Sequence, residues 1–173
     1  MGKMKKGSFL RDVLEVLIGS VIVVFVLIKF VLIPCRVDGT SMLKTLYDGD
    51  FGYSFVLTKN LGIDRFDIVV VEIDGEDEDK LLVKRVIGMP GETIRYSDNR
   101  LYVNDEYMAE EFLNSDAYTE DFEVVLADDE YYCLGDNRGF SRDSRYYGPF
   151  YAEQFVASHL FVLYPLSHFG VKK

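Results

Sequence analysis

An unbroken apolar run near the N-terminus constrains this chain more than any other feature. Residues 13–33 read VLEVLIGSVIVVFVLIKFVLI, and the only charged side chains among these 21 residues are those of Glu15 and Lys29. About 20 consecutive apolar residues are enough for a helix to cross a bilayer. Each charge lies near one end of the run, where a long side chain can extend toward the lipid headgroups. We therefore predict a membrane anchor over residues 13–34.

The charges on either side of the run predict its orientation. Four basic side chains precede it, whereas acidic residues accumulate soon after it; the basic residues are Lys3, Lys5, Lys6 and Arg11. Basic residues are retained on the cytoplasmic side of a membrane. We expect residues 1–12 in the cytoplasm and residues 13–34 in the plasma membrane as a single pass. Residues 35–173 are then an extracytoplasmic domain.

Three other interpretations of the run are less favourable. A removable secretory signal has an apolar core of only about 7–15 residues and a small-x-small cleavage site, and the exit sequence Ile33-Pro-Cys-Arg-Val37 contains no such site. A buried core helix is disfavoured by the length of the run and its near-uniform apolarity. Lipidation of Cys35 is disfavoured by the proline that precedes it.

Beyond residue 35 the pattern changes to alternation and short apolar runs between turn residues, which is typical of β-structure. The chain has 12 Tyr and 13 Phe but no Trp, a composition that suits sheets. We predict a mainly antiparallel β domain, with about residues 93–126 as an elaboration between core strands. The acidic run 74–79 is expected at a solvated hairpin tip, because it lacks the spacing of a calcium loop. The expected strands are 50–58, 66–73, 80–87, 93–96, 101–103, 123–126, 131–134 and 156–163.

Charge and cysteine content argue against two classes of site. Residues 35–173 hold 14 basic and 27 acidic side chains, and binding to a phosphate backbone needs a basic surface. We therefore expect no nucleic acid as a partner. Cys35 and Cys133 have neither the C-x-x-C nor the Cys/His spacing of a zinc site. We interpret both as ordinary thiols and expect no metal and no cofactor.

A candidate nucleophile, Ser41, follows the apolar run closely in the stretch Asp38-Gly-Thr-Ser-Met-Leu-Lys-Thr-Leu46. A serine hydroxyl is a weak nucleophile that needs a neighbouring base. His159 lies in an apolar strand pattern and His168 in the C-terminal tail, and spacing nominates no Asp partner for either, although a fold can assemble a triad from distant residues. We interpret both histidines as structural or surface residues.

The other candidate base is Lys84, in the segment Leu81-Leu-Val-Lys-Arg-Val-Ile87. In a strand, Lys84 and Arg85 point to opposite faces, and both faces are otherwise apolar. A guanidinium keeps its charge, whereas a desolvated ammonium can lose its proton. Lys84 is thus the usable base, unless both cations lie at a strand edge in water. The expected desolvating neighbours are Leu82, Val83 and Val86.

A polar loop, Leu134-Gly-Asp-Asn-Arg-Gly-Phe-Ser-Arg-Asp-Ser-Arg145, contains two Asp, three Arg and two Ser. Pairs of Asp and Arg can fix such a loop while a serine hydroxyl bonds a neighbouring group. For the segment taken alone, a cluster of surface ion pairs is the simpler interpretation.

Three motifs, in this order behind the apolar run, are similar to those of the type I bacterial signal peptidases, above all their small Gram-positive form. The motifs are GTSM at 39–42, KRVIGMPGE at 84–92 and GDNRGFSRDSR at 135–145. The resemblance extends over nearly the whole chain from the apolar run onward. It implies a Ser/Lys endopeptidase that removes signal peptides from secretory preproteins outside the plasma membrane, cutting after small residues. The lipid bilayer is a further partner, and the protein export machinery is a candidate one.

The resemblance also assigns roles to individual residues. Ser41 matches the nucleophile and Lys84 the general base, and Ser141 matches a serine whose hydroxyl orients the lysine. Asp143 and Arg145 match a pair that stabilises the site. Asp136 and Arg138 belong to the same structural motif. The residues implied to line shallow pockets for small side chains are Val37, Met42, Leu46, Leu82 and Val83.

Two positions depart from the family pattern. Lys44 stands where proline is common, so the turn after Ser41 is expected to be looser. Gly39 stands where some members have a serine that donates to the oxyanion. The oxyanion is therefore expected to rely on backbone N–H groups, including that of Ser41.

Two other functions share parts of this pattern. Self-cleaving LexA-type repressor proteases use the same Ser/Lys chemistry but carry a DNA-binding head, where this chain has an apolar run. A membrane-anchored β domain that binds exported proteins, with Ser41 and Lys84 incidental, is the non-enzymatic alternative. Preprotein cleavage by the wild type and its alanine variants separates these functions.

Overall fold

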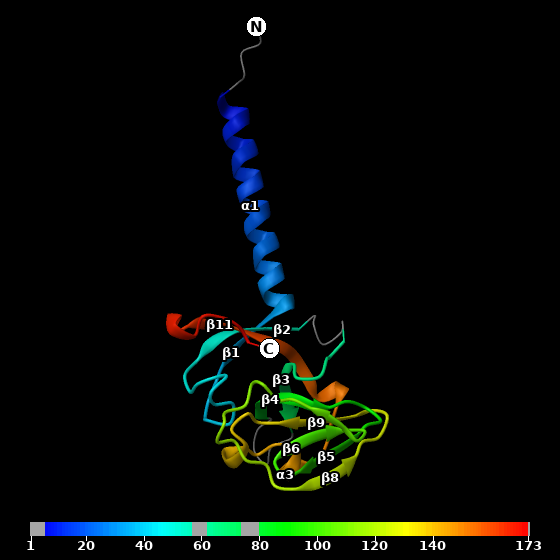
Figure 1. The fold of residues 1–173 in the computed structure, drawn as a ribbon. Coiled ribbons are helices and arrows are strands. Elements are labelled where there is room, and N and C mark those ends of the chain that lie inside the picture. The colour runs from blue at the N-terminus through cyan, green and yellow to red at the C-terminus, as the bar shows by residue number, and fades with distance from the viewer. Residues whose placement is uncertain (1–5, 57–61, 74–79, 173) are drawn as a thin grey trace.

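One long helix stands clear of a β domain. The structure, a computed structural model, describes residues 6–56, 62–73 and 80–172. α1 (Lys6–Val31) extends away from the domain, with its N-terminal end farthest from it, and runs directly into β1 (Leu32–Arg36) (Figure 1).

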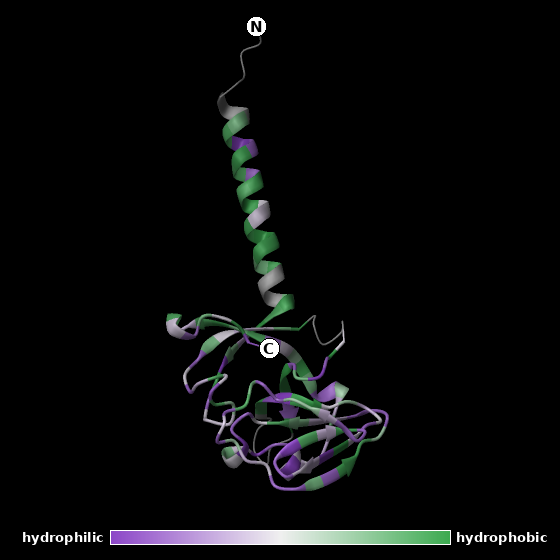
Figure 2. Ribbon diagram, in the orientation of Figure 1, coloured by the Kyte–Doolittle hydropathy of each residue, from purple (hydrophilic) through white to green (hydrophobic). Residues whose placement is uncertain are grey.

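Apolar residues make up most of α1 (Figure 2). Many of these side chains are exposed; Val16, Val21 and Phe25, for example, are 71%, 67% and 61% exposed. Near the N-terminal end, Arg11 pairs with Glu15 at 3.5 Å. Within the residues that the structure describes, no helix meets both the length and the hydropathy needed to cross a membrane. The membrane anchor stays a prediction.

The helix ends two residues before the apolar run does. Pro34 explains this, because proline cannot continue a helix and biases the residue before it toward extended backbone. Ile33 and Pro34 lie in β1, where they pair with Ser54 and Tyr53 of β2 (Phe51–Phe55). The predicted boundary of the anchor at residue 34 thus falls inside a strand.

The larger sheet runs through the whole domain. Among the described residues it has eight strands, in the order β1-β2-β11-β3-β4-β9-β10 with β12 paired to β11. All of its pairs are antiparallel. The long strand β11 pairs with β2 and β12 and also with β3, so it joins the helix-proximal strands to the centre of the sheet. The remaining strands of this sheet are β3 (Ile68–Ile73), β4 (Lys80–Gly88), β9 (Glu130–Leu134), β10 (Phe150–Tyr151), β11 (Phe155–Tyr164) and β12 (Gly170–Lys172).

A smaller antiparallel sheet lies at the end of the domain away from α1 (Figure 1). Within the described ranges it has four strands in the order β7-β6-β5-β8, which correspond to the elaboration expected over residues 93–126. Its strands are β5 (Thr93–Ser97), β6 (Arg100–Val103), β7 (Glu106–Met108) and β8 (Phe122–Val125). Short helices complete the domain: η1 (Arg138–Phe140), α3 (Ser144–Tyr147), η2 (Ala152–Gln154) and η3 (Leu166–His168).

The prediction of a mainly antiparallel β domain is confirmed, and every predicted strand has a counterpart within a few residues. Four strands were missed. β1 was assigned to the apolar run, and β7, β10 and β12 are only two or three residues long, too short for alternation to register. The last two residues of the first predicted strand and the acidic run 74–79 lie outside the described residues.

Three clusters of buried apolar side chains hold these layers together. The first, around Val86 and Phe155, fills one face of the larger sheet. The second includes Leu134 and joins the larger sheet to the smaller one. The third joins Met42, from the segment after β1, to Leu160 of β11. Each fully buried side chain of this size contributes about 1.5–3 kcal/mol, so the segment that carries Ser41 is held by the core.

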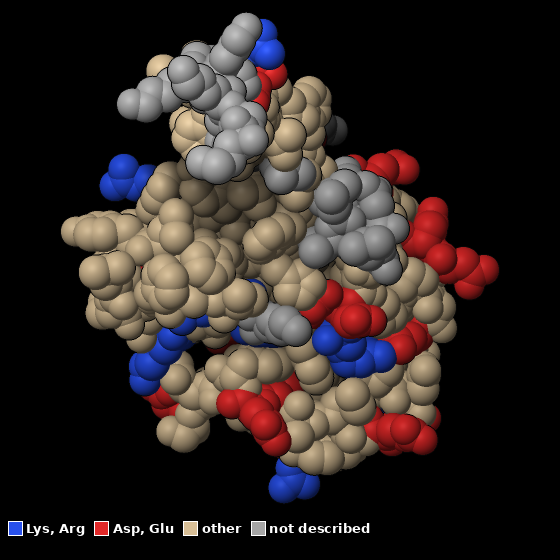
Figure 3. Space-filling model, turned by 90° about the horizontal axis from the view of Figure 1, so that it is seen from above, with Lys and Arg blue, Asp and Glu red and all other residues tan. Residues whose placement is uncertain are grey.

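Charged residues are unevenly distributed on the face from which α1 extends. Seen from above the helix, that face consists mostly of uncharged residues, and acidic residues lie toward its edges (Figure 3). The strands at this end are β1, β2 and β11 (Figure 1). The acidic excess of the domain is therefore directed away from the base of the helix on this face.

Gly52 of β2 permits the close approach of β11. A Cβ atom at this position would lie 2.0 Å from the carbonyl oxygen of Phe161. We expect Gly52→Ala to lower the free energy of unfolding by about 1–3 kcal/mol or more, the usual cost of overpacking. Gly139→Ala is the matched control, because no atom lies within 4 Å of a Cβ there. Urea unfolding measures both, and equal stability of the two variants would contradict the close approach.

Candidate active site

Ser41 lies in a tight turn between β1 and β2. The N–H groups of Thr45 and Leu46 both donate to the carbonyl of Met42, at 2.9 Å each. The side chains of Met42 and Leu46 are buried in the third core cluster. Lys44 therefore lies in a hydrogen-bonded turn, and the effect of lysine in place of proline on the looseness of this turn stays a prediction.

Gly39 leads into this turn with a φ of 92°, a left-handed conformation that favours glycine. Its N–H donates to Asp48 Oδ1 at 2.8 Å and is therefore already engaged. The Ser41 N–H, by contrast, meets no acceptor within the described part of the chain. Of these two amides, only that of Ser41 is open to a further acceptor.

Lys84 comes to Ser41 from the middle of β4. Its Nζ donates to Ser41 Oγ at 2.8 Å and to the carbonyl of Val83 at 2.9 Å. The residue is only 3% exposed. The strand register places it opposite Val69, which belongs to the first core cluster together with Val86 and Cys133. An amine held against this apolar face is poorly solvated.

The environment of Lys84 alters its protonation. Burial lowers the pKa of Lys84 to about 8, because the desolvated ammonium is disfavoured. The negative charge of Asp143 opposes this effect, with smaller contributions from Cys133 and Asp136. The net result is an amine that is still mostly charged at pH 7 but has a far larger neutral fraction than an ordinary lysine, whose pKa is about 10.4.

The neighbouring cation, Arg85, is buried on the opposite face of β4. It is 1% exposed and binds Asp136 with two hydrogen bonds, Nε to Oδ1 at 2.8 Å and Nη2 to Oδ2 at 2.7 Å. It also donates to the carbonyl of Phe66 at 2.7 Å, and its guanidinium lies 4.0 Å from the ring centroid of Phe112. Both cations of this pair are therefore buried, and only Arg85 has a carboxylate partner.

Asp136 connects this ion pair to the turn of Ser41. Thr45 Oγ1 donates to Asp136 Oδ2 at 2.5 Å. The next residue, Asn137, donates from its backbone N–H to the Ser41 carbonyl and from its side-chain amide to the Thr40 carbonyl, at 3.0 Å each. The loop after β9 thus holds the turn at three points.

Ser141 does not make the contact expected of it. Within the described residues no hydrogen bond joins Ser141 to Lys84. Its Oγ is buried beside the Asp143 carboxylate and has no partner in hydrogen-bonding geometry. It lies directly under Gly135, where a Cβ would be 2.2 Å from it and 2.5 Å from the Ser41 carbonyl oxygen. The absence of a side chain at Gly135 allows both contacts.

Asp143 and Arg145 form the expected pair. Arg145 donates to Asp143 from Nε at 2.9 Å and from Nη2 at 2.8 Å, and the Gly135 N–H donates to the same carboxylate at 3.0 Å. Burial raises the pKa of Asp143, but the hydrogen bonds from Arg145 and Gly135 outweigh it, so that the pKa lies below its usual value. The carboxylate therefore stays ionised and faces Lys84 with a full negative charge.

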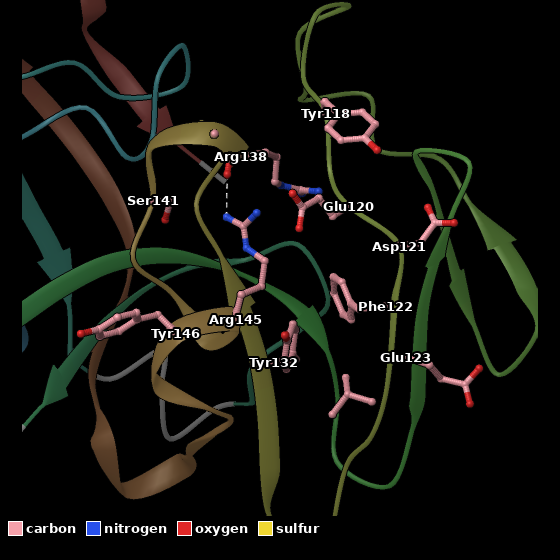
Figure 4. A pocket seen from close by; sticks show the side chains of 12 residues that line it. Tyr118, Glu120, Asp121, Phe122, Glu123, Tyr132, Arg138, Ser141, Arg145 and Tyr146 are labelled. Atoms are coloured by element: carbon pink, nitrogen blue, oxygen red, sulfur yellow. Dashed lines mark hydrogen bonds between the residues drawn. The ribbon is translucent and has the colours of Figure 1, made fainter.

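Arg138 binds residues outside its own loop. It does not pair with an Asp of its own loop. Instead it donates to Glu110 at 2.6 Å and to the Tyr96 hydroxyl at 2.8 Å, both in the smaller sheet region. Its Nε donates to the Gly135 carbonyl at 3.1 Å, and Arg145 donates to the Arg138 carbonyl at 2.8 Å (Figure 4).

Four contributors to the site were missed by sequence reasoning: Arg85, Thr45, Glu110 and Asn137. Arg85 could have been found, because its neighbourhood in sequence is as apolar as that of Lys84. Asn137 lies in a motif quoted for the resemblance and Thr45 in the stretch quoted around Ser41, but neither received a role. Nothing in the sequence links Glu110 to Arg138, because Glu110 follows β7 of the smaller sheet and Arg138 lies in η1, after β9 of the larger sheet.

The two histidines lie away from Ser41. His159 Nε2 is 3.2 Å from Asp67 Oδ1, and His168 Nδ1 is 2.7 Å from Asp50 Oδ1. Within the described residues neither histidine contacts Ser41. Each has an aspartate partner that sequence spacing did not nominate, and neither is placed to serve as its base.

The residues expected to line the substrate pockets divide between two clusters. Four of them lie in or against the third core cluster, close to Ser41. Leu82 packs against the first cluster instead, beside Lys84. Met42 and Leu46 are 1% and 0% exposed, so they form the floor below the site. The four residues of the third cluster are Val37, Met42, Leu46 and Val83.

Among the described residues no group of three His, Cys, Asp or Glu side chains could hold a metal ion. Cys35 and Cys133 are free thiols, and Cys133 is fully buried.

Comparison with known proteins adds independent information. Residues 10–164 match the family described as signal peptidase, peptidase S26. The chain is 35% identical to signal peptidase I of Streptococcus pneumoniae, covering 78% of this chain and 83% of that protein. It is 34% identical to signal peptidase I S of Bacillus subtilis, covering 94% of this chain and 93% of that protein.

Signal peptidase IB of Staphylococcus aureus gives a similar result, with 32% identity over 92% of this chain and 93% of that protein. Among solved structures, signal peptidase I of Enterococcus faecalis is 29% identical and aligns with a TM-score of 0.48. That alignment covers 59% of this chain and 97% of the other.

Removing Asp136 would leave Arg85 buried without a counter-charge. We expect Asp136→Ala to lower the free energy of unfolding by about 3–5 kcal/mol, as is typical when one partner of a buried pair is lost. Asp105→Ala is the control, because Asp105 pairs with Arg95 at 3.0 Å while 90% exposed; such pairs are worth about 0–1 kcal/mol. Chemical denaturation measures both. Similar losses in the two variants would mean that the Arg85 pair does not stabilise the loop.

Proposed function

This chain belongs to the signal peptidase family, peptidase S26, as a serine endopeptidase of the Gram-positive type I group, and we propose that it removes N-terminal signal peptides from exported preproteins with Ser41 and Lys84 as its catalytic pair. The contact that carries this proposal is the 2.8 Å hydrogen bond between Lys84 Nζ and Ser41 Oγ. A buried amine beside a serine hydroxyl is the arrangement that activates serine without histidine.

Acylation follows from this contact. The neutral Lys84 amine takes the proton of the Ser41 hydroxyl, and the resulting oxygen attacks the scissile carbonyl carbon. The peptide C–N bond then breaks, and the Lys84 ammonium returns its proton to the leaving amine. The products of this half-reaction are the mature protein with a free N-terminus and an ester between Ser41 and the signal peptide.

Deacylation uses the same base a second time. Lys84 takes a proton from water, and the hydroxide oxygen attacks the ester carbonyl. The C–O bond to Ser41 breaks, the serine oxygen regains a proton from Lys84, and the signal peptide leaves with a new carboxylate. A base whose pKa is about 8 suits both steps, because it is often neutral and still basic enough to accept a proton.

The oxyanion of the tetrahedral intermediate needs donors that point at the site before the reaction. The Ser41 N–H meets no acceptor within the described residues, whereas the Gly39 N–H is bonded to Asp48. We therefore assign the oxyanion contact to the Ser41 N–H and give Gly39 the role of shaping the backbone. The protonation of Lys84 is influenced by the Asp143 carboxylate, which Arg145 and Gly135 hold in place by hydrogen bonds.

Substrate selection is proposed to rest on the third core cluster. Its side chains near Ser41 are apolar and tightly packed, including Val37, Met42, Leu46 and Val83. A shallow surface over such a floor admits small side chains and excludes large ones by steric overlap. Apolar pockets discriminate by only about 1–3 kcal/mol per methylene group. We propose cleavage after small residues, of the Ala-x-Ala type.

The location is part of the same proposal. The apolar run 13–33 is long enough to span a bilayer, and the basic residues before it favour a cytoplasmic N-terminus. We propose a single-pass plasma-membrane protein whose β domain acts outside the cytoplasm. The bilayer would then hold the enzyme and the signal peptide of its substrate at the same surface, and the export machinery is a candidate neighbour.

The decisive test is cleavage of a secretory preprotein by the detergent-solubilised full chain. Ser41→Ala and Lys84→Ala are each expected to reduce kcat/KM by at least about 10³-fold, because each removes a group without which the attack cannot begin. Lys84→Arg is expected to fail as well, since a guanidinium does not give up its proton. Thermal unfolding verifies that the variants fold. Substantial cleavage by Ser41→Ala would leave the peptide-binding alternative in place.

The pH dependence of cleavage tests the state of Lys84. Only the neutral amine is active, so kcat/KM should rise about tenfold per pH unit below 8 and level off above the pKa of about 8. Asp143 favours the ammonium, so Asp143→Asn should lower the pKa of Lys84 and move the rising limb to lower pH. Asp105→Asn, at an exposed position, should leave the profile unchanged. A shift of the Asp143→Asn profile to higher pH would contradict this assignment.

A further inference from the structure

The turn that carries Ser41 has two chemically different sides. On one side Met42 and Leu46 are packed in the apolar third cluster. On the other side Asn137 of the loop after β9 donates to the Ser41 and Thr40 carbonyls. Under the proposed function, the signal-peptide end of the substrate takes the apolar side. The chain beyond the cut must then leave along the loop.

Two adjoining cavities lie along that loop. One, of about 380 Å³, has walls from the turn at Leu43 and Lys44, from residues 114–118 and from residues 136–140. The other, of about 580 Å³, shares Tyr118, Arg138 and Gly139 with it; its side chains are drawn in Figure 4. Cavities of this size are typical of binding clefts. We call the two together the exit groove.

The lining of the exit groove suits an extended polypeptide. Tyr118 and Phe140 are 63% and 77% exposed and line the smaller cavity. Exposed aromatic rings offer apolar contact to a chain of varied sequence. Tyr118 lines both cavities, and Figure 4 shows its ring among the side chains of the larger one. A chain that follows the smaller cavity would therefore reach the larger one past this ring.

One cation near the start of the groove has no counter-charge. Lys44 is exposed and lines the smaller cavity, three residues after Ser41. Within the described residues the Lys44 ammonium forms no ion pair. The carboxylate of Asp116, which lines the same cavity, forms none there either. Arg138 and Arg145 of the same loop, by contrast, are paired with carboxylates, and Arg142 lines neither cavity. Lys44 is therefore the cation that remains available to a substrate near the cut.

We propose that the exit groove binds the first residues of the mature chain and that Lys44 favours an acidic side chain there. This inference rests on the proposed function. An extended chain advances about 3.3 Å per residue, so Lys44 is expected to face about the second to fourth residue after the cut. Lys44 is a specificity-determining residue in this account and takes no part in the proton transfers.

Three matched preproteins that differ only at the third residue after the cut, as Glu, Gln or Lys, test the charge preference. For the wild-type full chain in detergent at low salt, we expect the Glu substrate to be cleaved about 2–5-fold more efficiently than the Lys substrate, the size of an exposed ion pair. Lys44→Glu should reverse the order and Lys44→Gln should remove it. High salt should weaken the preference in the wild type.

Arg100→Glu is the matched control, because it makes the same change in net charge on β6 and lines neither cavity; it should keep the wild-type order. Equal cleavage of the three substrates by the wild type would overturn the role of Lys44, as would an unchanged order in Lys44→Glu. Failure of the wild type to cleave any of them would instead overturn the proposed function. The two failures are therefore distinguishable.

Cross-linking gives a readout that does not depend on turnover. A preprotein with a photoreactive residue at the third position after the cut is irradiated with the Ser41→Ala variant, and the cross-linked peptides are identified by mass spectrometry. We expect cross-links to residues 114–118 and 137–140. Cross-links confined to the third core cluster or to the distal strands of the smaller sheet would overturn the assignment of the groove.

Discussion

The buried ion pair between Arg85 and Asp136 is the interaction on which the arrangement of Ser41 and Lys84 depends. Arg85 follows Lys84 on β4, so the two side chains point to opposite faces of the strand. Lys84, the proposed base, lies on one face, and Arg85, which binds Asp136 of the loop, lies on the other. Asp136 also accepts a hydrogen bond from Thr45, which lies in the turn of Ser41. Because a buried carboxylate and guanidinium are costly unless both are fully bonded, the two-point geometry leaves the loop little freedom to move. The distance between Ser41 Oγ and Lys84 Nζ is therefore set by a strand and a loop that are bonded to each other.

Lys84 differs from the arginines of the site in having no carboxylate partner within the described residues. Arg85, Arg138 and Arg145 each bind a carboxylate at 2.6–2.8 Å. Lys84, in contrast, bonds a hydroxyl and a carbonyl. Since an arginine cannot lose its proton, it needs a counter-charge when buried, whereas a lysine can release its proton instead. Burial lowers the pKa of Lys84, and the ionised Asp143 opposes this decrease, so that the pKa is about 8.

The two sides of the Ser41 turn give the proposed reaction a direction. The apolar third cluster joins the turn to β11, a strand at the end of the domain from which α1 extends (Figure 1). The exit groove lies on the other side, against the loop and the region of the smaller sheet. A substrate whose signal peptide is held near α1 would therefore deliver its mature chain toward the smaller sheet. In this account the elaboration between core strands supplies one wall of a substrate groove and, through Glu110, a partner for Arg138.

Local pattern was enough to predict much of this protein. Alternation predicted most of the strands, and the apolar neighbours of Lys84 predicted a desolvated amine, which the structure buries beside Ser41. The exceptions have physical causes. α1 ends before the apolar run does, because Pro34 cannot continue a helix and the residues around it pair with β2. The shortest strands are formed only through their pairing with neighbours. The partners of the charged residues were decided by tertiary structure alone: Arg85 with Asp136, Arg138 with Glu110, and each histidine with a distant aspartate. A residue's type and neighbours limit what it can do, but which charge it meets depends on which segments the fold brings together, because electrostatic partners are chosen by distance in space and not along the chain.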